Sequence, residues 1–194
     1  MKPKVLPVLF QNIPLALRTI PRWTLWNYVE VGEGETKRWS KLPIQPTGKA
    51  ASSTNASTWT DFHSVEAAYL TGKFDGIGFV FTKDDHIVGV DMDDCFDEAT
   101  NQFTNPELEA IANKLDGYME ISPSGTGVKI FTLGDIPSAF VDHSIGLEVY
   151  KMGRYFTVTG HKIRGEMPTE LQDFTNIIPE RTVRLTGDAF ADYN

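Results

Sequence analysis

The sequence predicts an α+β fold, in which a mainly antiparallel sheet is combined with a few short helices. Three pairs of strand-like segments are each separated by a short turn, which is typical of β-hairpins. Helix signals are few and fall between the strands instead of alternating with each of them. A length of 194 residues suits one substantial domain or two small lobes that share a core.

The first 75 or so residues predict a small α/β module. Residues 23–31 (WTLWNYVEV) predict a strand, because aromatic and β-branched residues favour extended backbone. A loop rich in basic residues follows and ends in the hydroxyl-rich stretch ASSTNAST. A helix is predicted at 61–70, with Thr60 or Asp61 as its N-cap and Gly72 as its stop.

Hairpins and further short helices are predicted for the rest of the chain. A helix fits 106–116, because Asn105 caps it, Pro106 takes its first position and Gly117 ends it. Another short helix is predicted at 168–178, and the tail after it is interpreted as a linker to a missing region. The predicted hairpins pair 76–82 with 87–92, 118–122 with 128–133, and 146–150 with 154–159.

Composition excludes several classes of protein. The formal net charge of −8 excludes a basic field over the whole protein, so any nucleic-acid site must be a local patch. Cys95 is the only cysteine, which excludes an intramolecular disulfide framework and a cysteine-cluster zinc site. The sequence has no apolar run near the roughly 20 residues that span a bilayer. We therefore expect an intracellular protein without a membrane partner.

The segment VGVDMDDC carries two carboxylates at a strand end. Asp91 and Asp93 are two positions apart, so both project from one face of an extended strand. Such close like charges repel each other, and Mg²⁺ would compensate them, since it favours carboxylate oxygens together with substrate phosphates. A solvated acidic strand end would show the same residues. An EF-hand does not fit, because Phe96 stands where that motif needs glycine.

The segment ISPSGTGVKIF predicts a tight turn between two strands. Ser122, Ser124 and Gly125 would present backbone N–H groups and hydroxyls to phosphate oxygens. Lys129 leaves the turn on the following strand, where its charge would face the same phosphates. An ordinary glycine-rich hairpin is the alternative, and the P-loop pattern GxxxxGK[ST] does not occur in the sequence.

Two stretches carry basic residues without acidic ones, and an acidic residue precedes the second. Glu148 stands between apolar neighbours in a strand, where a carboxylate usually faces solvent or a partner, and it would supply a third metal ligand. Each basic stretch either binds template or triphosphate or is a solvated surface. The basic residues predicted to bind nucleic acid are Lys37, Arg38, Lys41 and Lys49 in the first stretch, and Lys151 and Lys162 in the second.

Combined, these features point to one chemistry. Antiparallel strands would bring the paired aspartates and Glu148 to one face of a sheet, with the serine–glycine turn between them in sequence. Carboxylates for metals, a phosphate-holding turn and basic loops are the parts needed for phosphoryl or nucleotidyl transfer by two metal ions.

The sequence resembles the primase–polymerase (prim-pol) domain of the archaeo-eukaryotic primase superfamily, in the form found in phages, plasmids and other mobile elements. The first family motif, hydrophobic-Asp-x-Asp, matches Asp91 and Asp93, and the third, an acidic strand, matches Glu148 before GRYFTVTGH. The second motif matches SPSGTGV, but Lys129 stands where the family commonly has His. Lysine supplies only a charge, whereas His also changes protonation near neutral pH, so a weakened enzyme is conceivable.

The resemblance, over roughly residues 20–162, implies a small N-terminal α/β module packed on an RRM-like, mainly antiparallel catalytic sheet. The implied catalytic domain is 1–164, divided near residue 75, and 165–194 form a short helix and tail. The resemblance also implies nucleotidyl transfer from NTPs or dNTPs on a single-stranded DNA template, in the cytoplasm of a prokaryotic or phage-infected cell. Mg²⁺ or Mn²⁺ in a two-metal site would be the cofactor, and a helicase region of the same full-length protein would be a partner.

Particular residues receive roles from the resemblance. Asp91, Asp93 and Glu148 would be the catalytic residues and metal ligands. Tyr155 would crowd the sugar 2′ position as a steric gate between ribo- and deoxynucleotides. The implied nucleotide-binding residues are Ser122, Ser124, Gly125, Lys129, Arg154, Tyr155 and His161.

Two other functions stay open from the sequence. A two-metal nuclease would use the same carboxylates without a triphosphate-holding turn. A catalytically weakened nucleic-acid-binding module of a replication initiator would fit the exchange at Lys129. Retention of all three carboxylates argues against that module, because clustered acids without a use are costly.

Overall fold

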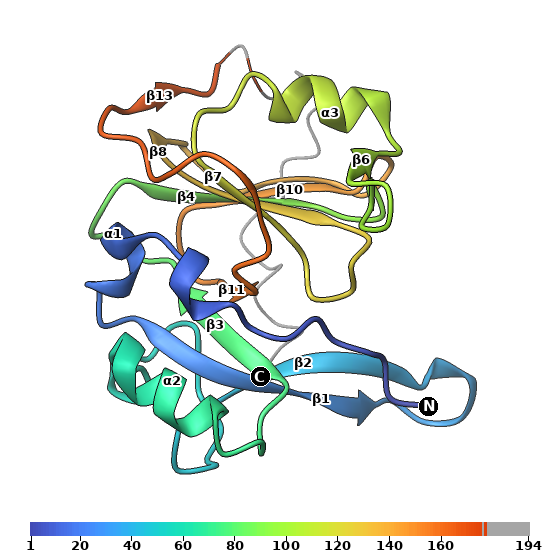
Figure 1. Cartoon of the computed structure of the whole chain (residues 1–194), viewed down its shortest axis with the longest axis vertical. Coiled ribbons are helices and arrows are strands. Elements are labelled where there is room, and N and C mark those ends of the chain that lie inside the picture. Colours follow the sequence, from blue (N-terminus) through green and yellow to red (C-terminus); the bar gives the residue numbers. More distant parts are fainter. Residues whose placement is uncertain (176, 178–194) are drawn as a thin grey trace.

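A computed structural model describes residues 1–175 and 177 of the chain. Two antiparallel sheets lie one above the other, with α3 over the larger sheet and α2 beneath the smaller one (Figure 1). The mainly antiparallel arrangement confirms the predicted α+β class. In strand order, the smaller sheet consists of β11 (Tyr155–Val158), β3 (Gly76–Val80), β1 (Trp23–Val31) and β2 (Arg38–Ile44).

The larger sheet is assembled from strands that lie between residues 87 and 173. Its strand order is β12 (Lys162–Arg164), β7 (Tyr118–Ile121), β8 (Val128–Asp135), β4 (Ile87–Met92), β10 (Leu147–Tyr150) and β9 (Phe140–Asp142). A seventh short strand, β13 (Gln172–Asp173), runs parallel to β8. A separate two-stranded pair is formed by β5 (Phe96–Asp97) and β6 (Gln102–Phe103).

The helices are short and begin where the sequence predicts. Asp61 caps α2 (Phe62–Tyr69), and its carboxylate accepts a hydrogen bond from the Ser64 backbone N–H. Asn105 caps α3 (Pro106–Ala112), which ends four residues before the predicted end. The other helices are α1 (Leu15–Arg18) and the 3₁₀ turns η1 (Phe10–Asn12), η2 (Gly34–Thr36) and η3 (Ala56–Thr58).

Of the three predicted hairpins, one is confirmed and two are wrong. β7 and β8 pair as expected. The strands β3 and β4 follow each other in sequence but lie in different sheets, and so do β10 and β11. β3 is buried along its whole length and pairs with β1 on one edge and β11 on the other. A short turn between two strands therefore marks a crossing between sheets at these two places, and the sheet that begins in the N-terminal module takes in both β3 and β11.

The predicted helix at 168–178 is wrong in its described part. Gln172–Asp173 extend along β8 as β13, and the Gln172 side chain accepts a hydrogen bond from the Asp116 backbone N–H. Phe174 is buried and joins the core below α3, which favours an extended chain over a helical turn. Residues 176 and 178, and the predicted tail that follows, lie outside the described residues.

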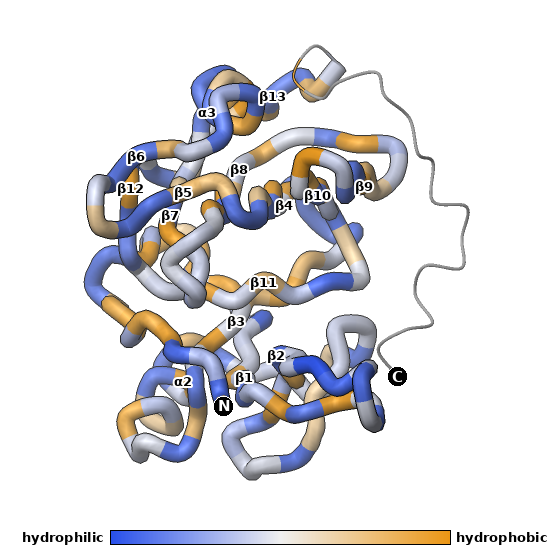
Figure 2. The backbone as a smooth tube through the Cα atoms, turned by 90° about the vertical axis from the view of Figure 1, so that its right-hand side faces the viewer, coloured by the Kyte–Doolittle hydropathy of each residue, from blue (hydrophilic) through white to orange (hydrophobic). Residues whose placement is uncertain are grey.

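Each face of the larger sheet packs into its own hydrophobic core. Val90 and Ile130 point up and meet Leu108 and Ile111 of α3. The alternate residues point down toward the smaller sheet, where Phe131 packs against Phe81 and Phe156. Figure 2 shows β11 running directly below this lower face. In the part of the chain that the structure describes, the helices are too short or too polar to cross a membrane.

Candidate active site

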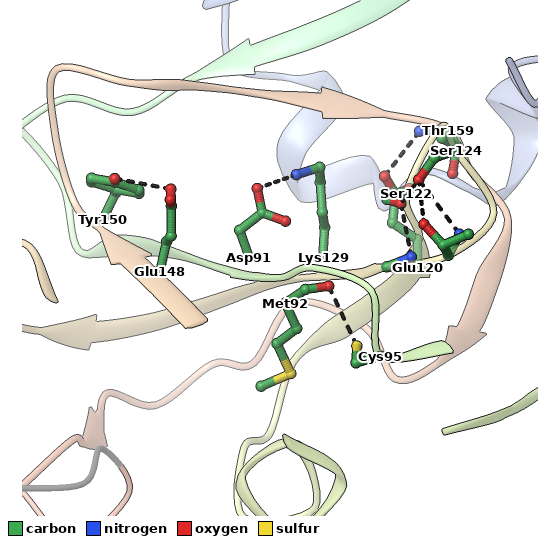
Figure 3. Close-up of polar contacts among 12 residues, drawn as sticks. Asp91, Met92, Cys95, Glu120, Ser122, Ser124, Lys129, Glu148, Tyr150 and Thr159 are labelled. Carbon is green, nitrogen blue, oxygen red and sulfur yellow. Dashed lines mark hydrogen bonds and ion pairs between the residues drawn. The ribbon is translucent and has the colours of Figure 1, made fainter. Parts of the chain in front are cut away.

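The register of the larger sheet aligns four charged residues on its lower face. Each residue lies directly opposite the next one on four neighbouring strands, β10, β4, β8 and β7. We call this set the charged row, and it consists of Glu148, Asp91, Lys129 and Glu120 (Figure 3). Two positions further along the same strands lies the aromatic row, which consists of Tyr150, Gly89, Phe131 and Tyr118.

The aromatic row forms an apolar floor beside the charges. Gly89 has no side chain, and the rings of Phe81 and Phe156 occupy the room that one would take. An added Cβ at Gly89 would lie 2.4 Å from the Phe81 ring and 2.5 Å from the Phe156 ring. The Phe156 ring reaches under the charged row, and its centroid is 4.7 Å from the Lys129 ammonium. A cation over an aromatic face is favourable, and apolar surroundings strengthen every charge interaction nearby.

Lys129 and Asp91 form the central ion pair of the row. The Lys129 Nζ donates to Asp91 Oδ2 at 2.5 Å, and the lysine is only 5% exposed. The other carboxylate oxygen, Asp91 Oδ1, is buried and has no hydrogen-bond partner. These contacts confirm that the Lys129 side chain points over the face that carries Asp91 and Glu148, as strand alternation predicts.

Asp93 lies just past the end of β4, at the mouth of the same site. Its backbone N–H donates to the Gly146 carbonyl at 2.8 Å, which fixes the chain at this point. Loss of hydration raises the pKa of the Asp93 carboxyl, and the charges of Asp91 and Glu148 raise it further, although Lys129 opposes them. The three predicted carboxylates therefore act on one another across a small region.

Glu148 is held by an aromatic neighbour on its own strand. The Tyr150 hydroxyl donates to Glu148 Oε2 at 2.9 Å, and the exposed His143 Nδ1 lies 3.8 Å from Glu148 Oε1. The Arg154 guanidinium carbon is 4.9 Å from the centroid of the Tyr150 ring. Arg154 and Glu148 thus both contact Tyr150.

The turn Ser122–Gly127 closes on itself and packs on the end of β4. The buried Ser122 hydroxyl accepts the Gly127 N–H at 3.1 Å, and the Gly125 N–H donates to the Ser122 carbonyl. An added Cβ at Gly127 would lie 2.6 Å from the Met92 carbonyl, so only glycine allows this approach. The N–H groups of both glycines are engaged inside the turn, and the hydroxyl of the exposed Ser124 is hydrogen-bonded to the hydroxyls of Ser122 and Thr126, each at 3.0 Å.

Comparison with known proteins finds a relative whose activity is named. The chain is 34% identical over 157 residues to a DNA primase-polymerase of Nitratiruptor phage NrS-1. The predicted resemblance to phage-type primase–polymerases is confirmed. The match covers 77% of this chain and 20% of the relative, so the chain spans about one fifth of the length of the primase–polymerase that it matches. No protein-family model matches the chain.

The donor chemistry of the site fits a divalent cation. Carboxylate oxygens are the ligands that Mg²⁺ and Mn²⁺ prefer, and Asp91 Oδ1 is a buried acceptor without a partner. No three acidic, histidine or cysteine side chains among the described residues form a ready-made metal cluster. Asp91 is turned to Lys129 and Glu148 to Tyr150 instead, so a metal ion would compete with Lys129 for Asp91.

Several predicted binding residues lie away from the charged row. The His161 ring is 2.8 Å from the Pro7 carbonyl, where it ties down the N-terminal segment. Lys162 pairs with Glu166, Lys151 pairs with Asp135, and Lys37 lies 3.4 Å from Glu30. The remaining members of the first basic stretch differ in exposure: Arg38 and Lys49 are exposed, and Lys41 is half-buried.

Glu120 is a site residue that sequence reasoning missed. It is fully buried and accepts hydrogen bonds from the Tyr118 hydroxyl and from the backbone N–H groups of Thr159 and Gly160, at 2.7 to 2.9 Å. Burial raises the pKa of its carboxyl to about 7, although these donors and Lys129 favour the charged form. An acidic residue within the apolar strand YMEI was the available signal, the same signal that singled out Glu148.

Proposed function

We propose that this chain is a DNA primase–polymerase, which joins NTPs or dNTPs on a single-stranded DNA template during replication of a phage or mobile element. The observation that carries the proposal is the charged row, where Glu148, Asp91 and Lys129 face one another on an apolar floor. The similarity to a phage DNA primase-polymerase supports it. The reaction would take place in the cytoplasm of the host cell, and a helicase region of the full-length protein would be a partner.

Three carboxylates would hold the catalytic metals. Asp91, Asp93 and Glu148 supply hard oxygen ligands, and Asp91 Oδ1 is a buried acceptor without a hydrogen-bond partner. Bound Mg²⁺ or Mn²⁺ would stabilise the negative charge that develops on the transferred phosphoryl group. The protein's own part is to fix these carboxylates on adjacent strands, where the sheet keeps their spacing constant.

The nucleotide would bind between the row and the serine–glycine turn. Lys129, which pairs with Asp91, and Arg154, which lies over the Tyr150 ring, would contact the triphosphate together with the hydroxyl of the exposed Ser124. Ser122 and Gly125 would support that contact by shaping the turn. His161 would act at a greater distance, through the N-terminal segment that it ties down.

Tyr155 would limit the space at the sugar. Its hydroxyl donates to the Lys41 carbonyl, and its ring lies against Gly78, so the side chain is held in place from both ends. A fixed aromatic wall beside a nucleotide discriminates by size, which is what a steric gate between NTPs and dNTPs requires.

The template would bind through basic residues that are exposed, except for the partly buried Lys151. Lys37, Arg38, Lys49, Lys151 and Lys162 carry the positive charge of the two stretches without acidic residues. Contacts of this kind release counterions from the DNA, so binding to single-stranded DNA should weaken steeply as salt is raised. Binding that is independent of salt would argue against a template role for these residues.

One incubation tests the proposed function. The protein is mixed with a single-stranded template, with or without primer, and labelled NTPs or dNTPs in Mn²⁺ or Mg²⁺. Incorporation that Asp91→Asn abolishes would support a primase–polymerase. Strand cleavage without incorporation would show a nuclease, and DNA binding without either reaction would show a binding module.

A further inference from the structure

Lys41 lies on the smaller sheet, close enough to the charged row for its charge to interact with Lys129 and Asp91. It lies on β2, paired with Tyr28 of β1, and its ammonium is 6.0 Å from the centroid of the Tyr28 ring. The Tyr155 hydroxyl of β11 donates to the Lys41 carbonyl. β2 and β11 are the two opposite edges of the smaller sheet, and the Tyr155 side chain bridges them across Gly78 of β3. This bond ties the strand that carries Lys41 to β11, which runs below the larger sheet (Figure 2).

The electrostatic surroundings of Lys41 are those of the catalytic face. Loss of hydration lowers the pKa of its ammonium, and the charge of Lys129 lowers it further, while Asp91 and Asp93 raise it. Two lysines from different sheets therefore act on each other and on two of the predicted metal ligands. Among the described residues, no hydrogen bond or ion pair holds the Lys41 ammonium.

Its neighbours in the first basic stretch behave differently. Lys37 lies 3.4 Å from Glu30, and both side chains are about half exposed. Lys49 is exposed near the end of the loop. Lys41 is thus the cation of this stretch that the fold directs away from solvent and toward the carboxylates.

The charge balance of the site indicates that Lys41 helps to bind an anion. Without metal, the three carboxylates outweigh the two lysines. With two divalent cations bound, the positive charges outweigh the carboxylates, and a polyanion is needed at the same place. The triphosphate of a nucleotide has this charge and must lie against the metals for transfer to occur.

We propose that Lys41 contacts the triphosphate of the incoming nucleotide from the smaller sheet, opposite Lys129, so that the nucleotide is held between the two sheets. This rests on the proposed function and changes the role of Lys41, which the sequence predicted to bind nucleic acid. The contact would also make binding depend on the tie between β2 and β11.

The test compares Lys41→Met with Lys49→Met as its matched control. Methionine keeps the apolar stem that packs on Tyr28 and removes the charge. Two affinities are measured for each protein in Mn²⁺: that for a fluorescent, non-hydrolysable nucleoside triphosphate and that for a labelled single-stranded oligonucleotide. We expect Lys41→Met to weaken nucleotide binding at least about tenfold and to leave DNA binding unchanged, because a charge-assisted contact is lost. Lys49→Met should show the opposite pattern.

Each other outcome overturns the inference in a distinct way. Weakened DNA binding with unchanged nucleotide binding in Lys41→Met would return the residue to a template role. Unchanged binding of both ligands would show that Lys41 contacts neither. A folded wild-type protein that binds DNA but no nucleotide would overturn the proposed function itself, together with this inference.

Discussion

The charged row and the aromatic row occupy the same face of the same four strands, two residues apart, but they differ in how their side chains are paired. Phe131, in the aromatic row, is fully buried and stacks against Phe81, with ring centroids 5.8 Å apart. Asp91, in the charged row, keeps one buried oxygen without a partner. The packed rings stabilise the fold. The unpaired carboxylate oxygen of Asp91 is an acceptor that a ligand can still bind. A shift of two residues along each strand, which keeps the same face, separates the row that packs from the row that carries charge.

The largest effect is expected from Asp91→Asn. This change keeps the shape of the side chain and removes the charge that would hold a metal. Nucleotide incorporation should fall on the order of a thousandfold, which is the upper range for loss of one preorganised electrostatic contact. The free energy of unfolding should change by less than about 1 kcal/mol, because Glu120 still faces Lys129 from the other side. Incorporation at the wild-type rate would remove Asp91 from the proposed site.

Phe131→Ala should give the reverse pattern. Truncating a fully buried Phe typically destabilises a protein by about 3–5 kcal/mol, through lost burial and the cavity left behind. Denaturant unfolding measures this loss, and incorporation per folded molecule should stay within a few-fold of wild type at low temperature. A Phe131→Ala protein as stable as wild type would contradict the division of labour between the rows.

Lys129→Ala tests the residue that departs from the family motif. The ammonium is the positive member of the charged row, so its loss should slow incorporation on the order of a hundredfold. Lys129→His, which restores the family residue, should retain more activity than Lys129→Ala. Rates are compared at subsaturating nucleotide, and equal rates for wild type and Lys129→Ala would reject a role in catalysis or triphosphate binding.

Glu120→Gln should change how the free energy of unfolding depends on pH. The pKa of Glu120 is raised from 4.5 to about 7, so the folded state holds this proton more tightly than the unfolded state. The stability that the group contributes is complete below the unfolded pKa and is lost as pH rises toward about 7. The wild type should therefore lose, relative to Glu120→Gln, on the order of 3 kcal/mol across this window. Unfolding curves in acidic and in mildly basic buffer measure the difference, and a constant difference would show that Glu120 does not titrate there.

Strand alternation made much of the site predictable. It set Lys129 and Phe131 on one face of β8 and Val128 and Ile130 on the other, as the structure confirms. Strand alternation does not identify the strands that pair with β3 and β11. A turn of a few residues can join two strands of one sheet or lead from one sheet to another. The position of Lys41 also depends on the bond from the Tyr155 hydroxyl to its carbonyl, which joins residues 114 positions apart and leaves no local signal.

Glu120 shows a different limit. Its strand was recognised, and its register opposite Lys129 followed from the confirmed hairpin. Its carboxylate accepts hydrogen bonds from the backbone N–H groups of Thr159 and Gly160, about 40 residues further along the chain. The sequence alone did not predict that this segment lies next to Glu120. A buried carboxylate is therefore identified by the partners that the fold supplies, more than by its own strand.

Metal binding tests the central claim most directly, because it needs no substrate. Mn²⁺ is titrated into wild type, Asp91→Asn and Glu120→Gln, and the bound ion is followed by electron paramagnetic resonance. Both variants lose one acidic group from the charged row, but only Asp91 offers an oxygen without a partner. The account predicts that Asp91→Asn weakens Mn²⁺ binding at least about tenfold, while Glu120→Gln binds within a few-fold of wild type. Equal affinities in wild type and Asp91→Asn, or an equal loss in both variants, would contradict it.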